Sequence, residues 1–260
     1  MNCADIIERL EQLSPLHYAE EWDNVGLLLG RRQKEVTSVF VALDATMEVI
    51  DEAIRLESDM IVTHHPMIFR AIKRASDDDF IGARIVKLLR YDISYYAMHT
   101  NFDVMGMADA AADALQLTGR QVLDVTFEDD ISKEGIGRLG LLPDVMSLKE
   151  LAMFVKSAFD VSDVRVYGDL ERKTEKIALC PGSGKSVIGQ SLKEAADVLV
   201  TGDIDYHEGI DAVAQGLCII DAGHYGIEKL FIPYMRDFLH RELPQITVHT
   251  AERKDPFVTL

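Results

Sequence analysis

The sequence predicts an α/β protein with largely parallel β-sheet. Short runs rich in β-branched residues alternate along the chain with stretches of helical periodicity, and glycine-bearing or acidic turns separate them. The chain has 260 residues, of which 48% are hydrophobic, so it can bury one large core or two ordinary ones. These two observations favour one or two layered α/β domains.

The first half of the chain alternates helix and strand. Asn2 is a suitable N-cap for a first helix, and residues 46–56 have the amphipathic spacing of a helix that covers a sheet. Strands are expected where short apolar runs stand between turn residues. The expected helices are 2–13, 46–56, 81–89 and 108–117, and the expected strands are 36–43, 60–63 and 93–98.

The second half continues this alternation. Ser147 and Glu150 have the spacing of a capping box that opens a helix. Pro233 falls inside the last expected helix and should kink or restart it. The expected helices are 147–159, 187–196, 207–215 and 224–239, and the expected strands are 164–167, 176–180, 198–201, 218–220 and 246–249. Residues 128–137 are acidic and glycine-bearing, which predicts a crossover between domains.

Composition narrows the class of partner. The net charge of −17, from 44 acidic and 27 basic residues, disfavours non-specific binding to nucleic acid or to an anionic membrane. The sequence has no apolar run of the roughly 18 residues that a membrane helix needs, and its N-terminus resembles neither a signal nor a transit peptide. The three cysteines are scattered, without a CxxC pair. We therefore expect a cytoplasmic protein, and this charge balance does not exclude a small anionic substrate held by a metal.

Metal-capable side chains follow several predicted strands at their carboxyl ends. Ligands of open α/β sheets bind at this edge, so we expect one site assembled from distant segments. An alternative remains for the aspartates, which also favour helix N-caps. The residues at strand ends are Asp44, His64, His65, His99, Asn101, Asp103, Asp203, Asp205, His207, Asp221 and His224.

The adjacent imidazoles of His64 and His65 would point to opposite faces within a strand. Pro66 follows them and cannot continue a central strand, so the chain leaves the sheet here and both rings can serve one site. His224 and Glu228 are four residues apart on a predicted helix and share one face. A solvent-exposed pair is the alternative for that spacing.

The candidate ligands are three imidazoles and two carboxylates. Such mixed nitrogen and oxygen ligands suit two divalent ions of Zn, Fe, Mn or Ni better than Mg or Ca. Ions of this kind convert bound water to a hydroxide nucleophile near neutral pH. The proposed ligands are His64, His65, Asp103, His224 and Glu228. The candidates for supporting these ligands or transferring protons are His99, Asp203 and His207.

Two further motifs have ordinary structural readings. Cys180–Ser186 resembles a phosphate-binding loop, but Leu179 stands where that loop requires its first glycine, so a strand-to-helix turn is favoured. Trp22, the only tryptophan, precedes Asp23 and Asn24 in a turn sequence. It either lines a pocket or anchors the turn.

Five segments together resemble the NIF-three-like family, whose members are often named GTP cyclohydrolase I type-two homologues. They span most of the chain in the family's order, and they are Glu21–Gly26, Thr63–Pro66, His99–Asp103, Thr201–Asp203 and Gly223–Glu228. The resemblance implies two intertwined three-layer α/β/α domains, a dinuclear metal site at their junction with the five ligands above, and a ring-shaped homohexamer. We place the first domain at residues 1–128 plus about 216–260, and the second at about 129–215.

The resemblance leaves three functions open, and it does not decide whether the protein is an enzyme. The first is a dinuclear metal-dependent hydrolase that opens the purine ring of GTP with a metal-bound hydroxide. The second is a two-metal hydrolase of another small molecule or phosphoester. The third is a non-enzymatic, metal-binding or regulatory ring protein.

Overall fold

The computed structural model describes residues 1–258, which fall into two compact units. Unit 1 consists of Met1–Phe102 and Phe231–Arg253, and unit 2 consists of Asp103–Leu230 and the segment from Lys254 onward. Both units are therefore discontinuous in sequence, and the main segment of unit 2, Asp103–Leu230, is inserted between the two segments of unit 1. Within residues 1–258, the helices are all too short or too polar to span a bilayer.

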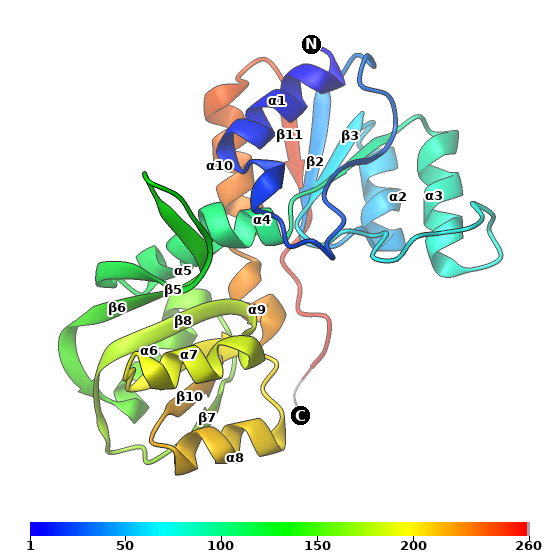
Figure 1. Cartoon of the computed structure of the whole chain (residues 1–260). Coiled ribbons are helices and arrows are strands. Elements are labelled where there is room, and N and C mark those ends of the chain that lie inside the picture. The colour runs from blue at the N-terminus through cyan, green and yellow to red at the C-terminus, as the bar shows by residue number, and fades with distance from the viewer. Residues whose placement is uncertain (259–260) are drawn as a thin grey trace. The chain divides into compact units, whose positions relative to one another are not determined.

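Unit 1 is built on a five-stranded sheet with the order β1-β4-β3-β2-β11, of which β3, β2 and β11 are labelled in Figure 1. Its four later strands run parallel, and β1 pairs antiparallel with β4. Residues of β2, β3 and β4 are all buried, as expected for parallel strands covered on both faces. The strands are β1 (Gly26–Leu29), β2 (Ser38–Ala42), β3 (Met60–Thr63), β4 (Ser94–Ala97) and β11 (Thr247–Thr250).

Helices cover both faces of this sheet, with α1 and α10 on one side and α2 and α3 on the other (Figure 1). Asn2 and Asp5 form a reciprocal capping box that opens α1. Ile50 of α2 and Ile85 of α3 pack in one core with the sheet residue Phe40. The helices are α1 (Cys3–Leu13), α2 (Met47–Arg55), α3 (Phe80–Arg90), α4 (Thr100–Phe102) and α10 (Phe231–Glu242).

Unit 2 contains a six-stranded mixed sheet with the order β5-β6-β8-β9-β10-β7. The strands β8, β9 and β10 are parallel, and the remaining pairs are antiparallel. The strands are β5 (Thr118–Glu128), β6 (Lys133–Ser147), β7 (Arg165–Tyr167), β8 (Lys173–Ser183), β9 (Val198–Gly202) and β10 (Cys218–Asp221).

Strand β8 shows how the second sheet separates two cores. Ile177 and Leu179 face the cluster formed with α5 and α6, and Ala178 and Cys180 face the cluster of α7 and α8. Unit 2 is thus also a three-layer structure, which confirms the predicted fold class. Its helices are α5 (Ala108–Ala114), α6 (Leu148–Phe159), α7 (Ile188–Lys193), α8 (Tyr206–Ala214) and α9 (His224–Glu228).

The structure corrects the expected crossover at residues 128–137. These residues belong to a long β5–β6 hairpin whose turn is held by Asp129, which accepts hydrogen bonds from the amides of Ile131 and Ser132. Strand β5 lies at the sheet edge and is mostly exposed, so it lacks the apolar pattern of a buried strand. The two compact units meet in the chain after Phe102 and after Leu230.

Strand β1 differs from the sequence prediction, whereas the helix restart near Pro233 agrees with it. Strand β1 was not expected, because its sequence Gly-Leu-Leu-Leu lacks the β-branched residues that marked the equally short strand β3. Pro233 lies in the first turn of α10, where its missing amide hydrogen leaves no hydrogen bond unmade. The expected helix 224–239 is therefore two helices, α9 and α10, and this restart separates unit 2 from unit 1.

Candidate metal centre

The parallel register of unit 1 explains why its metal-capable residues gather at one edge. Ala42 pairs with Thr63, and Thr63 pairs with Ala97, so β2, β3 and β4 end side by side. Each strand is followed within a few residues by imidazole or carboxylate groups. These are Asp44 after β2, His64 and His65 after β3, and His99 after β4.

A buried polar network fixes the turn that carries the histidine doublet. Strand β3 ends at Thr63, as the position of Pro66 predicted. The hydroxyls of Thr63 and Tyr95 lie 2.8 and 2.9 Å from the carbonyl oxygen of His65 and 2.7 Å from each other. The amide of Met67 donates to the Tyr95 hydroxyl over 2.8 Å. The turn leaves the ring centroids of His64 and His65 only 4.9 Å apart.

His64, His65 and His99 each offer one ring nitrogen, and these three atoms lie within 4.8 Å of one another. Each ring is also hydrogen-bonded through Nδ1. Nδ1 of His64 lies 2.8 Å from Met98 O. Nδ1 of His65 lies 2.9 Å from Asp44 Oδ1, and Nδ1 of His99 lies 2.9 Å from Asp23 Oδ1. A carbonyl oxygen only accepts, so Nδ1 of His64 must donate and its neutral ring carries the lone pair on Nε2. This orientation is typical of metal-binding histidines.

Asp23 is a site residue that the sequence did not reveal. Its side chain is fully buried, and its second oxygen accepts from the amide of Thr100 over 3.0 Å. Burial alone would raise its pKa, but hydrogen bonds from His99 and Thr100 prevail and lower the pKa to about 2. Asp23 is therefore an anion at neutral pH that holds the His99 ring. Local sequence indicated only a turn, because its partners lie in a distant segment.

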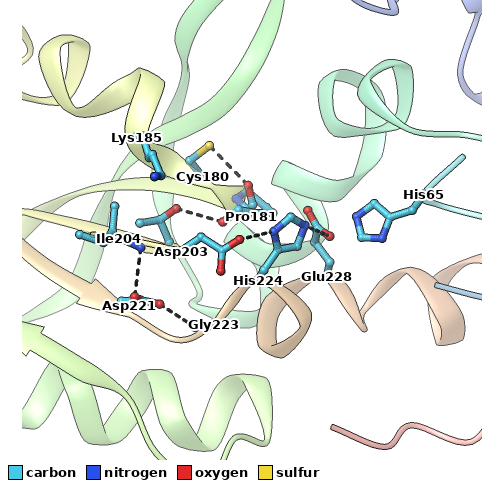
Figure 2. Close-up of polar contacts among 12 residues, drawn as sticks. His65, Cys180, Pro181, Lys185, Asp203, Ile204, Asp221, Gly223, His224 and Glu228 are labelled. Atoms are coloured by element: carbon cyan, nitrogen blue, oxygen red, sulfur yellow. Dashed lines mark hydrogen bonds and ion pairs between the residues drawn. The ribbon is translucent and has the colours of Figure 1, made fainter. Parts of the chain in front are cut away.

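Unit 2 holds a second group of metal-capable side chains at the ends of β9 and β10 (Figure 2). Nδ1 of His224 lies 2.8 Å from Asp203 Oδ2, and its Nε2 lies 2.9 Å from Glu228 Oε2. The i,i+4 pair therefore interacts directly, with Glu228 nearly buried. One oxygen of Asp103 lies within 4.8 Å of one of Glu228. The three proposed ligands of this unit are thus brought together.

The glycine-rich loop after Cys180 packs against these ligands. Gly182 has φ +70°, and a Cβ there would lie 2.4 Å from Glu228 Oε1 and 3.6 Å from His224 Nε2. Burial raises the pKa of the Cys180 thiol, and the nearby charges of Asp103 and Glu228 raise it further. Position 182 requires glycine because a larger residue would collide with the Glu228 carboxylate. The sequence pattern did not indicate this contact between two distant segments.

The predicted supporting residues have different outcomes. His99 lies among the unit 1 imidazoles and is itself placed as a candidate ligand. Asp203 orients His224. His207 is exposed at the start of α8, where its ring contacts Tyr206 at a centroid distance of 5.1 Å, and its role stays a prediction. Asp205 caps α8 and pairs with Lys185.

The residues present fit a divalent metal. Buried and half-buried imidazoles with fixed Nδ1 protons, together with carboxylates, form the nitrogen and oxygen donor set that borderline divalent ions prefer. The groups of His64, His65 and His99 in unit 1 and of His224 with Glu228 in unit 2 could each contribute to holding a metal ion.

Comparisons with known proteins agree on one family. The family model described as Duf34/NIF3 (NGG1p interacting factor 3) matches residues 1–256. A Clostridium perfringens protein named GTP cyclohydrolase 1 type 2 homolog is 35% identical over 261 residues, which cover 99% of both chains. A homologue of the same name from Lactococcus lactis is 34% identical, also over 99% of both chains.

Solved structures show the same fold. A Bacillus cereus protein related to NIF3 superposes with a TM-score of 0.90 at 27% identity, covering 100% of this chain and 99% of that one. Reduced HcgD from Methanocaldococcus jannaschii superposes with a TM-score of 0.83 at 30% identity, covering 96% of this chain and 97% of that one. The similarity thus extends over both units.

Proposed function

The chain belongs to the Duf34/NIF3 family, and we propose that it is a dinuclear metal-dependent hydrolase, with the reaction that the name of its relatives, GTP cyclohydrolase 1 type 2 homolog, suggests. Its ligands are His64, His65, Asp103, His224 and Glu228. The observation that supports this most directly is the hydrogen bonding of the imidazoles. His64, His65 and His224 each engage Nδ1 with a carbonyl or carboxylate oxygen, which prepares Nε2 to bind a metal.

Divalent ions held by these residues supply Lewis-acid activation of water for hydrolysis. Asp44 and Asp203 fix the ring planes of His65 and His224 and keep their Nδ1 atoms protonated. Glu228 is nearly buried and lies beside His224, so its carboxylate adds negative charge where a cation is bound.

His99 is the proposed proton-transfer group. Asp23 is anionic and accepts from Nδ1 of His99, so the ring can take up a second proton at Nε2 while its position stays fixed. In purine ring opening, this ring would accept a proton from the attacking water and return it to the leaving nitrogen. His99 lies close enough to His64 and His65 to act on the same substrate.

A second candidate is hydrolysis of a less anionic small molecule than GTP. A cavity of about 350 Å³ in unit 2 is lined by Arg165, Ser183, Lys185, Asp203, Ile204 and Asp205. Its two cations are already paired, Arg165 with Asp221 over 2.7 Å and Lys185 with Asp205. Paired cations give less binding energy to a triphosphate than unpaired ones. This pairing favours a substrate without that charge.

Metal analysis combined with a turnover assay tests the proposal. We expect the purified protein to hold about two divalent ions per subunit and to release formate from GTP. His65→Ala and Glu228→Ala should lose most of the metal and keep the fold, measured by elemental analysis and circular dichroism. His207→Ala is the matched control, because that exposed ring should leave the metal content unchanged.

The outcomes separate the candidates. Metal without formate, but with turnover of an uncharged or monophosphorylated substrate, selects the second candidate. Metal without turnover of any nucleotide or phosphoester selects a metal-binding protein that is not a hydrolase. Full metal content in both ligand variants contradicts the proposed site. Light scattering of the same samples tests the proposed homohexamer.

A further inference from the structure

Two large aromatic rings stand exposed beside the imidazoles of unit 1. Trp22 is 60% exposed and Phe69 is 49% exposed. Their planes are nearly parallel, with an interplanar angle of 13° and centroids 6.4 Å apart. Both rings stand edge-to-face with His99, at centroid distances of 5.9 and 5.5 Å and angles of 75° and 76°. One imidazole of the candidate metal centre thus contacts both rings.

Each exposed ring is held by buried neighbours in the chain. Trp22 precedes Asp23, whose side chain is fully buried and bonded to His99 and Thr100. Phe69 follows Ile68, which is buried and whose carbonyl accepts from Asn24 Nδ2 over 2.6 Å. That bond ties the Trp22 turn to the Phe69 turn. The backbone on which the two rings stand is therefore anchored, and the rings themselves stay largely uncovered, although leaving such apolar surface in water is unfavourable.

A centroid distance of 6.4 Å is at the far end of the range for an aromatic pair. The rings therefore cover little of each other, in agreement with their exposure. Two parallel, uncovered rings offer π-faces of the same orientation, and flat heteroaromatic rings such as nucleobases bind to such faces by stacking. Aliphatic or saturated groups gain less from this geometry.

We propose that Trp22 and Phe69 form a stacking platform for a flat heteroaromatic ring of the substrate, beside His64, His65 and His99. This inference rests on the proposed function and narrows its substrate class. The ring binds parallel to the two side chains and next to His99, which places it at the candidate metal centre. Neither aromatic side chain needs to take part in the reaction.

Intrinsic fluorescence tests the platform directly, because Trp22 is the only tryptophan in the chain. We expect guanosine, GTP and pterin to change its emission saturably, after correction for the light that they absorb. Ribose 5-phosphate and inorganic triphosphate, which lack a flat ring, should leave it unchanged. Phe69→Leu should raise the Kd for guanosine about ten-fold or more, and Phe69→Tyr should restore it.

Phe80→Leu is the matched control, because Phe80 is 68% exposed in the same unit and begins α3. The platform is overturned if no ring compound changes the emission, or if the two leucine variants bind guanosine equally well. It is also overturned if diluting the protein without any ligand changes both the Trp22 emission and the particle size measured by light scattering. Trp22 would then lie in a subunit contact.

Measuring both Trp22 emission and formate release, on metal-loaded and on chelator-treated protein, distinguishes this inference from the proposed function. Saturable stacking in a protein without turnover supports the platform and removes the hydrolase. Formate release from GTP with unchanged Trp22 emission and an unaffected Phe69→Leu variant removes the platform and leaves the hydrolase.

Discussion

Asp23 Oδ1 lies 2.9 Å from Nδ1 of His99, although the two residues are 76 positions apart in the chain. The other oxygen of the same carboxylate accepts from both the amide and the hydroxyl of Thr100. The side chain of Asp23 is fully buried. One carboxylate thus fixes a candidate proton-transfer ring and the start of α4 together.

Asp23→Asn should lower the free energy of unfolding above pH 4. It should also make that free energy depend less on pH in the acid range. The folded pKa of Asp23 is about 2, below its ordinary 3.8, so its ionised form contributes stability above pH 3.8. That contribution is lost as the pH falls through about 2. It amounts to about 2 kcal/mol for this buried group. Urea unfolding from pH 6 down to pH 2 measures the difference between the two proteins.

Asp129→Asn provides the comparison for that series. The pKa of Asp129 is also lowered, by the amides of Ser132 and Ile131, but this residue lies in an exposed hairpin turn. Solvent screens such a group, so its replacement should change the acid response little. Equal pH profiles for Asp23→Asn and the unmodified protein would contradict an ionised, buried Asp23.

Replacing Tyr95 or Tyr96, the neighbouring tyrosines of β4, by phenylalanine should have opposite effects on stability. Both are fully buried, and burial raises the pKa of each hydroxyl, to about 12 for Tyr95. Tyr95→Phe removes the acceptor of the Met67 amide, which should cost about 1–3 kcal/mol. The Tyr96 hydroxyl has no hydrogen-bond partner among residues 1–258, so Tyr96→Phe should be neutral or stabilising. Denaturant midpoints measure both, and equal losses would refute the assigned network.

The sequence predicted at which edge of the sheet the histidines of unit 1 lie. The local sequence alone shows which residues directly follow a strand. The apolar runs predicted to end at Thr63 and Met98 were visible, and His64, His65 and His99 follow them. Where burial on both faces makes a strand apolar throughout, the pattern is strong.

The features that the sequence missed depend on contacts between distant segments or on exposed strands. Strand β5 is an exposed edge strand without a clear apolar pattern, so its hairpin with β6 was mistaken for a crossover. Asp23 and Gly182 meet their partners only after folding. Propensity explains each of these residues as part of a turn, and it carries no information about what the turn packs against.

Gly182→Ala should displace Glu228 and weaken metal binding. The added Cβ would lie 2.4 Å from Glu228 Oε1, and φ of +70° disfavours any residue with a side chain. We expect a loss of stability of about 1–3 kcal/mol and a lower metal content by elemental analysis. Gly189→Ala, in helix α7, meets nothing within 4 Å and should be neutral or slightly stabilising. Unchanged metal content in Gly182→Ala would contradict the close approach.

Asp203→Asn should weaken metal binding without unfolding the protein. Asp203 Oδ2 accepts from Nδ1 of His224, and an amide there no longer requires the tautomer with its lone pair on Nε2. Loss of such a supporting carboxylate typically lowers metal affinity 10–100-fold, which competition with a fluorescent chelator measures. Asp205→Asn is the matched control, because Asp205 pairs with Lys185 and caps α8. It should lose some stability and retain the metal, and an equal loss of affinity in both variants would show that Asp203 acts only through local charge.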